Sequence, residues 1–517
     1  MCILFVMPYP GYLRYFDTVV RALAARGHDV HLAWEMPTKQ VEGLMALADV
    51  ASVTVHDLPK RDDDWRRAAK RIRFAVDHAR YLDARFAGAH YLRDRAAEKV
   101  EWPFSPLRRL TTMPRPLLRA LLRGLLALER ALPRGPAIDA FIRELEPEVV
   151  LVSPLVTPAS RQADVVASAR ALGIPTAAAI ASWDNLTNKG ILRIQPERLI
   201  VWNEAQRREA SELHGYPADC VVATGAQCFD RWFERRPRRT RADFCERVGL
   251  TVEEPFFLFV GSTASISAPD AEKRFVQAWL RRMRAHPDLR DRPVLIRPHP
   301  YNSGHWAADD LAGFENVAVW PRTGANPVDE SDRDDYFESL AYSEVVIGIN
   351  TTAMVEAAIL GRPVLTVAAE AFADTQGGTL HFQHLLPENG GFVRHALALD
   401  EHLEQLAAAV ADPEAASLRT REFVHSFLRP RGLDRDATTP FVEAVEAIAE
   451  LTATPVERKA IDGVLRAGLR ALVIADLARD GRWRKHMRKR VRRVRGRVGR
   501  LVRLLGRVAS AGRNATR

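Results

Sequence analysis

Apolar runs alternate with amphipathic segments along the first part of the chain. ILFVMP (3–8) and VHLAW (30–34) flank FDTVVRALAARGHDV, whose apolar positions recur at helical spacing before Gly27. This β-α-β order is typical of a parallel, doubly wound sheet. The rhythm resumes with EVVLVSP (148–154), IPTAAAIAS (174–182), RLIVWN (198–203) and CVVATG (220–225). We therefore expect an N-terminal doubly wound α/β domain over residues 1–235.

Two helical patterns interrupt this first series. A basic stretch from Arg66 to Arg95 has helical periodicity, and RPLLRALLRGLLALERAL (115–132) is apolar on one side and arginine-rich on the other. We expect them to form a helical insertion or lid on the first domain, at about residues 60–135.

A second β/α series follows the polar stretch ERRPRRTR (234–241), which is typical of an interdomain linker. Its apolar runs are PFFLFVGS (255–262), PVLIRPHP (293–300), NVAVWP (316–321), EVVIGIN (344–350) and RPVLTVA (362–368). They predict a second doubly wound domain over residues 240–425. Two such domains leave a cleft between the carboxyl ends of their strands, where parallel sheets bind ligands.

The length and composition agree with this organisation. A chain of 517 residues exceeds the size at which a single hydrophobic core keeps growing. The four cysteines have no CxxC spacing, so neither a disulfide framework nor a zinc site is indicated, and we expect no bound metal and a reduced, cytoplasmic protein. No signal peptide and no apolar stretch of membrane-spanning length is apparent.

The net charge of +10 comes from the C-terminal end. Residues 481–517 contain 15 Lys and Arg but no Asp or Glu, so the rest of the chain is slightly acidic. Within the expected helical tail (451–517), Val491, Val494, Val498 and Val502 recur at helical spacing between arginines. This pattern favours binding to an anionic membrane surface, with a solvated tail and nucleic-acid binding as the alternatives.

The strand-to-helix turn in GINTTAMVEAAILGRPVLTV (348–367) is the first candidate site. Thr351 and Thr352, with the unpaired N–H groups of the helix start, could hold a nucleotide phosphate. Glu356 lies one turn further along, where its carboxylate could accept hydrogen bonds from a ribose. The alternative is a simple helix cap, although no Glu or Gln stands at the capping-box position.

Two further segments belong to the same expected sheet edge. His299 ends the strand LIRPHP, which also contains Arg297, and a histidine there can donate to a phosphate or leaving group. Gly261, Ser262 and Thr263 follow the first strand of the second domain and offer amides and hydroxyls to phosphate oxygens. A structural histidine and a plain loop are the respective alternatives.

The first domain contains residues that could bind an acceptor substrate. In ASWDNLTNKG (181–190), Asp184 is a candidate general base for an acceptor hydroxyl, with an Asx turn or helix cap as its alternative. Neighbouring residues predicted to contact the acceptor are Trp183, Asn185 and Lys189, together with Gly11, Arg14 and Tyr15 after the first strand. The chain lacks GxGxxG, GxxxxGK[ST] and GxSxG motifs, which weakens dehydrogenase, P-loop and hydrolase readings.

Residues 1 to about 445 resemble GT-B glycosyltransferases. The first β-α-β unit and INTTAMVEAAILGRPVLTV carry this resemblance, and RPHP with the later hydroxyl pair is similar to capsule and surface polysaccharide glycosyltransferases and CDP-glycerol glycerophosphotransferases. It implies two Rossmann-like domains facing a cleft, with TTPFVEAVEAIAELT in a helix (426–450) that crosses back to the first lobe. The histidine that many inverting members carry after the first strand is missing, which makes Asp184 the substitute.

The resemblance implies a function. We expect a metal-independent glycosyltransferase that uses a nucleotide-sugar donor, needs no other cofactor, and extends a glycan or lipid-linked acceptor in surface polysaccharide or glycolipid biosynthesis. His299 would assist the departing phosphate, and the protein would lie at the inner face of the plasma membrane without binding nucleic acid. A CDP-glycerol-type glycerophosphotransferase and a non-hydrolysing UDP-GlcNAc 2-epimerase-like isomerase are the alternatives.

Overall fold

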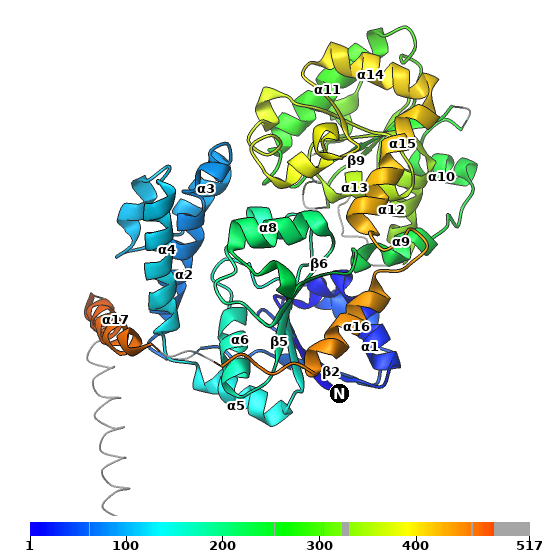
Figure 1. The fold of residues 1–517 in the computed structure, drawn as a ribbon. Helices are drawn as coiled ribbons and strands as arrows, with labels where there is room; N and C mark the ends of the chain where they lie inside the picture. Colours follow the sequence, from blue (N-terminus) through cyan, green and yellow to red (C-terminus); the bar gives the residue numbers. More distant parts are fainter. Residues whose placement is uncertain are drawn as a thin grey trace, which may run out of the picture.

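The chain forms two lobes, each built on a parallel sheet (Figure 1). The computed structural model describes residues 1–61, 63–252, 254–300, 302, 304, 306–322, 330–455 and 459–479. The two doubly wound α/β domains predicted from the sequence are confirmed. Of the helical tail expected over residues 451–517, the structure describes residues 451–455 and 459–479, and the arginine-rich part at 481–517 lies outside the described residues.

The first lobe contains a seven-stranded sheet in the order β3-β2-β1-β4-β5-β6-β7, and every neighbouring pair is parallel. Its strands are β1 (Cys2–Met7), β2 (Asp29–Trp34), β3 (Val53–Asp57), β4 (Val149–Val152), β5 (Thr176–Ala179), β6 (Arg198–Val201) and β7 (Val221–Ala223). Its helices include α1 (Asp17–Ala25), α5 (Pro136–Leu145), α6 (Gln162–Ala171), α7 (Asn185–Asn188) and α8 (Glu204–His214). The central strands are apolar throughout because both sheet faces are covered by helices. The strand order reverses between β1 and β4.

The second lobe contains a six-stranded parallel sheet in the order β10-β9-β8-β11-β12-β13. Its strands are β8 (Phe256–Val260), β9 (Val294–Arg297), β10 (Val317–Val319), β11 (Ser343–Gly348), β12 (Val364–Val367) and β13 (Arg394–Ala396). Its helices are α10 (Arg241–Val248), α11 (Pro269–Ala285), α12 (Glu330–Tyr342), α13 (Thr352–Ile359), α14 (Leu399–Ala411) and α15 (Pro413–Phe423). Here the order reverses between β8 and β11, so both lobes carry a topological switch point.

The insertion forms a helical layer beside the first lobe (Figure 1). It comprises α2 (Arg66–Arg80), α3 (His90–Ala97) and α4 (Arg115–Arg130), and α17 (Ala460–Arg479) packs on α2 and α4. The helical pattern expected from Arg66 to Arg95 is broken after α2, where the Asp83 carboxylate caps a short 3-10 turn. Buried Arg73 donates to Glu129 (2.7 Å) and Asp164 (2.9 Å), which ties α2 to α4 and α6.

The two lobes are joined at two places. The stretch 234–241 connects them after α9 (Asp230–Glu234) and is held by α12, where Glu338 accepts from Arg239 at 2.7 Å. The chain returns through α16 (Thr438–Ala449), whose buried Phe441 and Val445 belong to the core of the first lobe. Ahead of α16, the Asp230 carboxylate accepts from the backbone N–H of Ala437 at 3.0 Å. These contacts fix how the strand ends of the two sheets face each other.

Candidate active site

The polar residues predicted at strand ends come from the same edge of each sheet, because all strands are parallel. In the first lobe, the 3-10 helix η1 (Pro10–Tyr15) follows β1, and Asp184 stands between β5 and α7. In the second lobe, Gly261 follows β8, His299 lies two residues after β9, and Thr351 precedes α13.

Arg14 of the first lobe faces the second lobe. Its Nη2 donates to the Tyr15 hydroxyl at 2.6 Å. Its positive charge lowers the pKa of both His299 and Glu356, which places these groups of the second lobe within electrostatic range. Arg14 itself is exposed to solvent. We call Arg14, Tyr15, Asp184, His299 and Glu356 the interlobe site.

His299 is held as a neutral imidazole. Burial, followed by the charge of Arg14, lowers the pKa of His299 to about 4. At neutral pH the ring can therefore donate a hydrogen bond without carrying a fixed positive charge. Close approach of the β8 loop contributes to this burial, since a Cβ on Gly261 would lie 2.8 Å from the His299 backbone nitrogen. Only glycine fits there.

The β8 loop is anchored by its own hydrogen bonds. The backbone N–H of fully buried Ser262 donates to Glu272 at 2.8 Å, and its carbonyl accepts from Asn302 at 2.7 Å. The Thr263 hydroxyl lies 2.8 Å from that of Ser265. Burial raises the pKa of Glu272 to about 7, against the hydrogen bond from Ser262. Ser262 thus shapes the loop, and its contact with a donor phosphate stays a prediction.

The helix α13 begins at the carboxyl end of β11 with its hydroxyls available. Thr351 occupies the N-cap position with extended backbone, but its side chain makes no capping hydrogen bond. Thr352 is exposed to solvent. The first turn of α13 contains no acidic residue that would repel an anion. No side-chain hydrogen bond therefore supports the alternative that Thr351 is only a helix cap.

Glu356 of α13 contacts the neighbouring helix α12. It accepts a hydrogen bond from the Tyr336 hydroxyl. Burial raises the pKa of Glu356 to about 7, although Tyr336, Arg14 and Arg297 oppose the shift. Arg297 is buried beneath it, with its guanidinium 4.9 Å from the centre of the Tyr336 ring, and burial lowers the pKa of Arg297 to about 10. Arg297 is therefore buried inside the second lobe, where its positive charge lowers the pKa of Glu356.

Asp184 has a different environment. Its carboxylate lies 3.5 Å from the Lys189 ammonium and accepts from the Asn185 amide at 3.1 Å. Burial alone would raise the pKa of Asp184, but Lys189, His381 and local hydrogen bonds lower it to about 2. Asp184 makes no capping hydrogen bond to α7. It is thus a permanently ionised group and a weak base.

Other residues predicted to bind the acceptor already make contacts within the protein. The Asn185 amide oxygen accepts from the backbone N–H of Ala181 and Ser182, both at 3.2 Å. Trp183 is buried with its ring 4.7 Å from that of His381. Gly11 allows close contact with Gln40, whose Oε1 would lie 2.1 Å from an added Cβ. Their binding roles stay predictions.

His381 and Tyr336 are site residues that the sequence reasoning missed. The ring nitrogens of buried His381 lie 2.9 Å from the Asn188 amide nitrogen and 3.2 Å from that of Asn350, so His381 bridges the two lobes. Neither residue stands at a strand end or in a recognisable motif. Docking of the lobes brings His381 to Asn188, whereas the packing of α12 on α13 within the second lobe brings Tyr336 to Glu356.

Two classes of site were sought in the described part of the chain. No cluster of three or more His, Cys, Asp or Glu side chains there is arranged to hold a metal ion. No helix there combines the length and apolar character needed to cross a membrane.

Known proteins resemble this chain in fold. No family model and no curated protein sequence matches it. The UDP-GlcNAc 2-epimerase from Neisseria meningitidis bound to UDP-GlcNAc superposes with a TM-score of 0.51 at 13% identity, covering 86% of this chain and 100% of that one. A glycosyltransferase from Rickettsia africae superposes with a TM-score of 0.50 at 9% identity, covering 87% and 99%. At these identities the likeness establishes the shared two-lobed fold.

The facing of Arg14 and His299 predicts a coupled titration. In the wild-type protein, the His299 ring should stay neutral from pH 8 down to about pH 5, because its pKa is about 4. Arg14→Gln should raise the His299 pKa, since the repelling charge is gone. Histidine ring NMR from pH 8 down to about pH 3, assigned with His299→Gln, measures both values. An unchanged His299 pKa in Arg14→Gln would show that the lobes do not face each other as described.

Proposed function

We propose that the protein is a GT-B glycosyltransferase that moves a sugar from a nucleotide-activated donor to a glycan or lipid-linked acceptor, without a metal ion. The observation that carries this proposal is solvent-exposed Arg14 of one lobe, whose charge acts on His299 and Glu356 of the other lobe across the space that separates them. A donor diphosphate in that space would neutralise Arg14 and relieve its repulsion of a protonated His299.

The donor side is proposed at the start of α13. The hydroxyls of Thr351 and Thr352 and the first N–H groups of the helix would hold the phosphates, and the helix dipole adds a favourable field. Glu356 is placed one turn along for the ribose hydroxyls. Gly261 and Thr263 would approach the phosphates from the β8 loop, next to His299.

The reaction would join an acceptor hydroxyl oxygen to the anomeric carbon of the sugar while the bond from that carbon to the diphosphate breaks. Charge then grows on the leaving phosphate, where Arg14, His299 and the helix start would stabilise it. Asp184 is the proposed base, but Lys189 must move away before it can take a proton at neutral pH. Glu356, with a pKa of about 7, is the second candidate for that role.

An isomerase is the second candidate function. It is favoured by the fold shared with the UDP-GlcNAc 2-epimerases, which use a nucleotide-sugar without an acceptor. An isomerase has no need of a surface that holds a membrane-bound acceptor, and this difference separates the two proposals.

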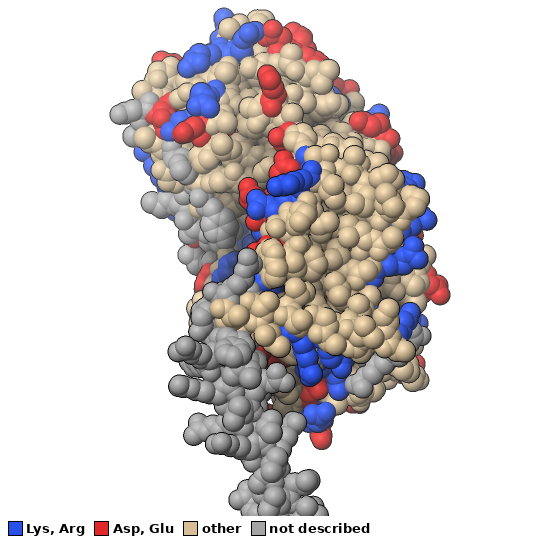
Figure 2. All heavy atoms as spheres, turned by 90° about the vertical axis from the view of Figure 1, so that its left-hand side faces the viewer, with Lys and Arg blue, Asp and Glu red and all other residues tan. Residues whose placement is uncertain are grey.

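Such a surface is proposed on the outer side of the helical insertion. The apolar residues Ile461, Val464 and Ile474 of α17 are 56%, 72% and 38% exposed, and Leu117 of α4 is 60% exposed. Exposed Arg115, Arg119 and Arg123 lie along α4. Figure 2 shows this side as broad uncharged areas with charged side chains of both signs, Lys and Arg as well as Asp and Glu, at their margins. Apolar residues framed by arginines suit the inner, anionic face of the plasma membrane, and the basic sequence 481–517 continues from α17.

Nucleotide binding tests the donor side. UDP, GDP, CMP and CDP should be compared by thermal shift, because a ligand that binds only the folded state raises the melting temperature. The double variant Thr351→Val/Thr352→Val should bind the preferred nucleotide at least about 100-fold more weakly, since it loses two hydrogen bonds to a charged phosphate and each is worth roughly 1.5–3 kcal/mol. Thr111→Val, at an exposed position, is the control. Equal affinity in all three proteins would exclude this phosphate site.

Product analysis tests the reaction class. With a nucleotide-sugar and a membrane extract as acceptor source, His299→Ala and Asp184→Ala should each lower glycosyl transfer at least about 100-fold, the scale typical for lost acid–base or charge stabilisation. Both variants should keep the wild-type circular dichroism. Formation of an epimer from UDP-GlcNAc alone would instead favour the isomerase, and full activity of both variants would favour a non-catalytic binding protein.

Vesicle sedimentation tests the proposed membrane surface. Val464→Asp should lower the fraction of protein bound to vesicles of anionic phospholipid, because a carboxylate replaces exposed apolar surface. Leu418→Asp, at a 65% exposed position on α15, is the matched control and should bind as the wild type does. Equal binding of the two variants would remove α17 from the membrane proposal.

A further inference from the structure

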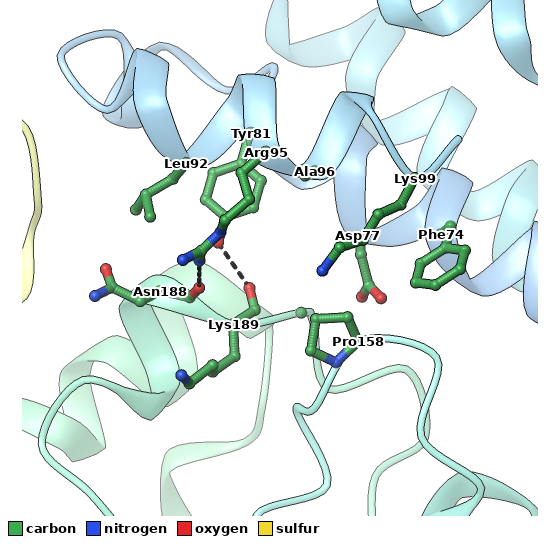
Figure 3. A pocket seen from close by; sticks show the side chains of 11 residues that line it. Phe74, Asp77, Tyr81, Leu92, Arg95, Ala96, Lys99, Pro158, Asn188 and Lys189 are labelled. Carbon is green, nitrogen blue, oxygen red and sulfur yellow. Dashed lines mark hydrogen bonds between the residues drawn. The ribbon is translucent and has the colours of Figure 1, made fainter. Parts of the chain in front are cut away.

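A pocket of about 220 Å³ lies between the helical insertion and the first lobe (Figure 3). Phe74 of α2, Tyr81 directly after α2, and Leu92 of α3 form apolar walls. The floor is the backbone around Asn188 and Lys189, whose carbonyl oxygens accept from Arg95 (3.0 Å) and from the Tyr81 hydroxyl (2.8 Å). These hydrogen bonds fix the pocket's shape before any ligand enters.

The pocket holds positive charge that the described protein does not neutralise. The Lys99 ammonium makes no hydrogen bond or ion pair with a described residue, and Figure 3 shows it directed into the pocket. Arg95, four residues earlier, pairs with no carboxylate in the described chain. Burial, then the charges of Arg95 and Lys189, lowers the pKa of Lys99, with Asp77 opposing. Two like charges at this spacing repel each other, so a bound anion would relieve them.

Asp77, an acidic residue that lines the pocket, already accepts hydrogen bonds from the protein. The Asp77 carboxylate accepts from Arg193 at 2.5 Å and from the backbone N–H of Ile191 at 3.2 Å. Gly190 makes this contact possible, since an added Cβ would lie 2.2 Å from Asp77 Oδ1. Lys189 turns away from the pocket toward Asp184. Arg95 and Lys99 are therefore the groups that a ligand would meet.

We infer that this pocket, which we call the helical pocket, binds the phosphate or carboxylate group of a small sugar between Arg95 and Lys99, with the ring against Phe74 and Tyr81. Its volume is about seven times that of a liquid water molecule (about 30 Å³), which suits one ring-sized ligand. The preference for an anion rests on the charges alone. The choice of a sugar as its carrier rests on the proposed function.

The helical pocket is a separate site from the interlobe site but shares a wall with it. Asn188 and Lys189 line the pocket, while the Asn188 side chain contacts His381 and that of Lys189 contacts Asp184. Asn188 and Lys189 would thus stand between a charged group held in the pocket and the proposed reaction centre.

NMR of ¹³C-methylated lysines in the full-length protein tests this inference, because methylation keeps the lysine charge. The Lys99 signal is assigned by its loss in Lys99→Gln and titrated with glucose 6-phosphate, glucuronate, inorganic phosphate and glucose. Glucose 6-phosphate or glucuronate should shift it saturably, whereas glucose should not. Arg95→Gln should weaken that binding about tenfold through loss of a charge-assisted hydrogen bond.

Two controls separate this result from the nucleotide site. Exposed Lys60, on a loop of the first lobe, should give no saturable shift. Thr351→Val/Thr352→Val should keep the Lys99 response, so a failed donor proposal leaves this test intact. A Lys99 response no larger than that of Lys60, or one equally strong with glucose, would overturn the inference.

Discussion

Parallel pairing of all thirteen strands in the described part of the chain is the constraint on which the rest depends. It sends every strand's carboxyl end to one edge of its sheet, so loops and helix starts with unpaired N–H groups collect there. Docking through α16 and Asp230 then sets the two edges against each other. Arg14 meets His299 and Glu356 only because both conditions hold, and neither lobe alone contains this combination of charges.

The charges of the interlobe site favour binding of a negatively charged ligand. Arg14 is exposed between the lobes, and burial together with its charge keeps His299 neutral. An anion there would stabilise Arg14 and the protonated form of His299 at once. The pKa values of Asp184 and Glu356 differ because their surroundings differ. Lys189 holds one carboxylate ionised, while burial brings the pKa of the other close to neutral pH.

Much of the fold could be predicted from the sequence because buried strands of parallel sheets are continuous apolar runs. The two strands missed, β3 and β13, are edge strands whose residues are partly exposed, so VTVHD and RHA carry no such signal. At the site, Thr351 and His299 could be found because each follows an apolar run. His381 could not, because it reaches Asn188 only when the lobes dock, and the low pKa of Asp184 depends on how Lys189 folds back toward it.

Hydrogen exchange with and without a saturating nucleotide-sugar tests most directly whether a nucleotide is held between the lobes. Binding there predicts slower exchange in peptides of both lobes, around residues 10–16 and 182–190 in the first, and around 261–265 and 350–357 in the second. Protection confined to one lobe, or located away from these strand ends, would contradict it.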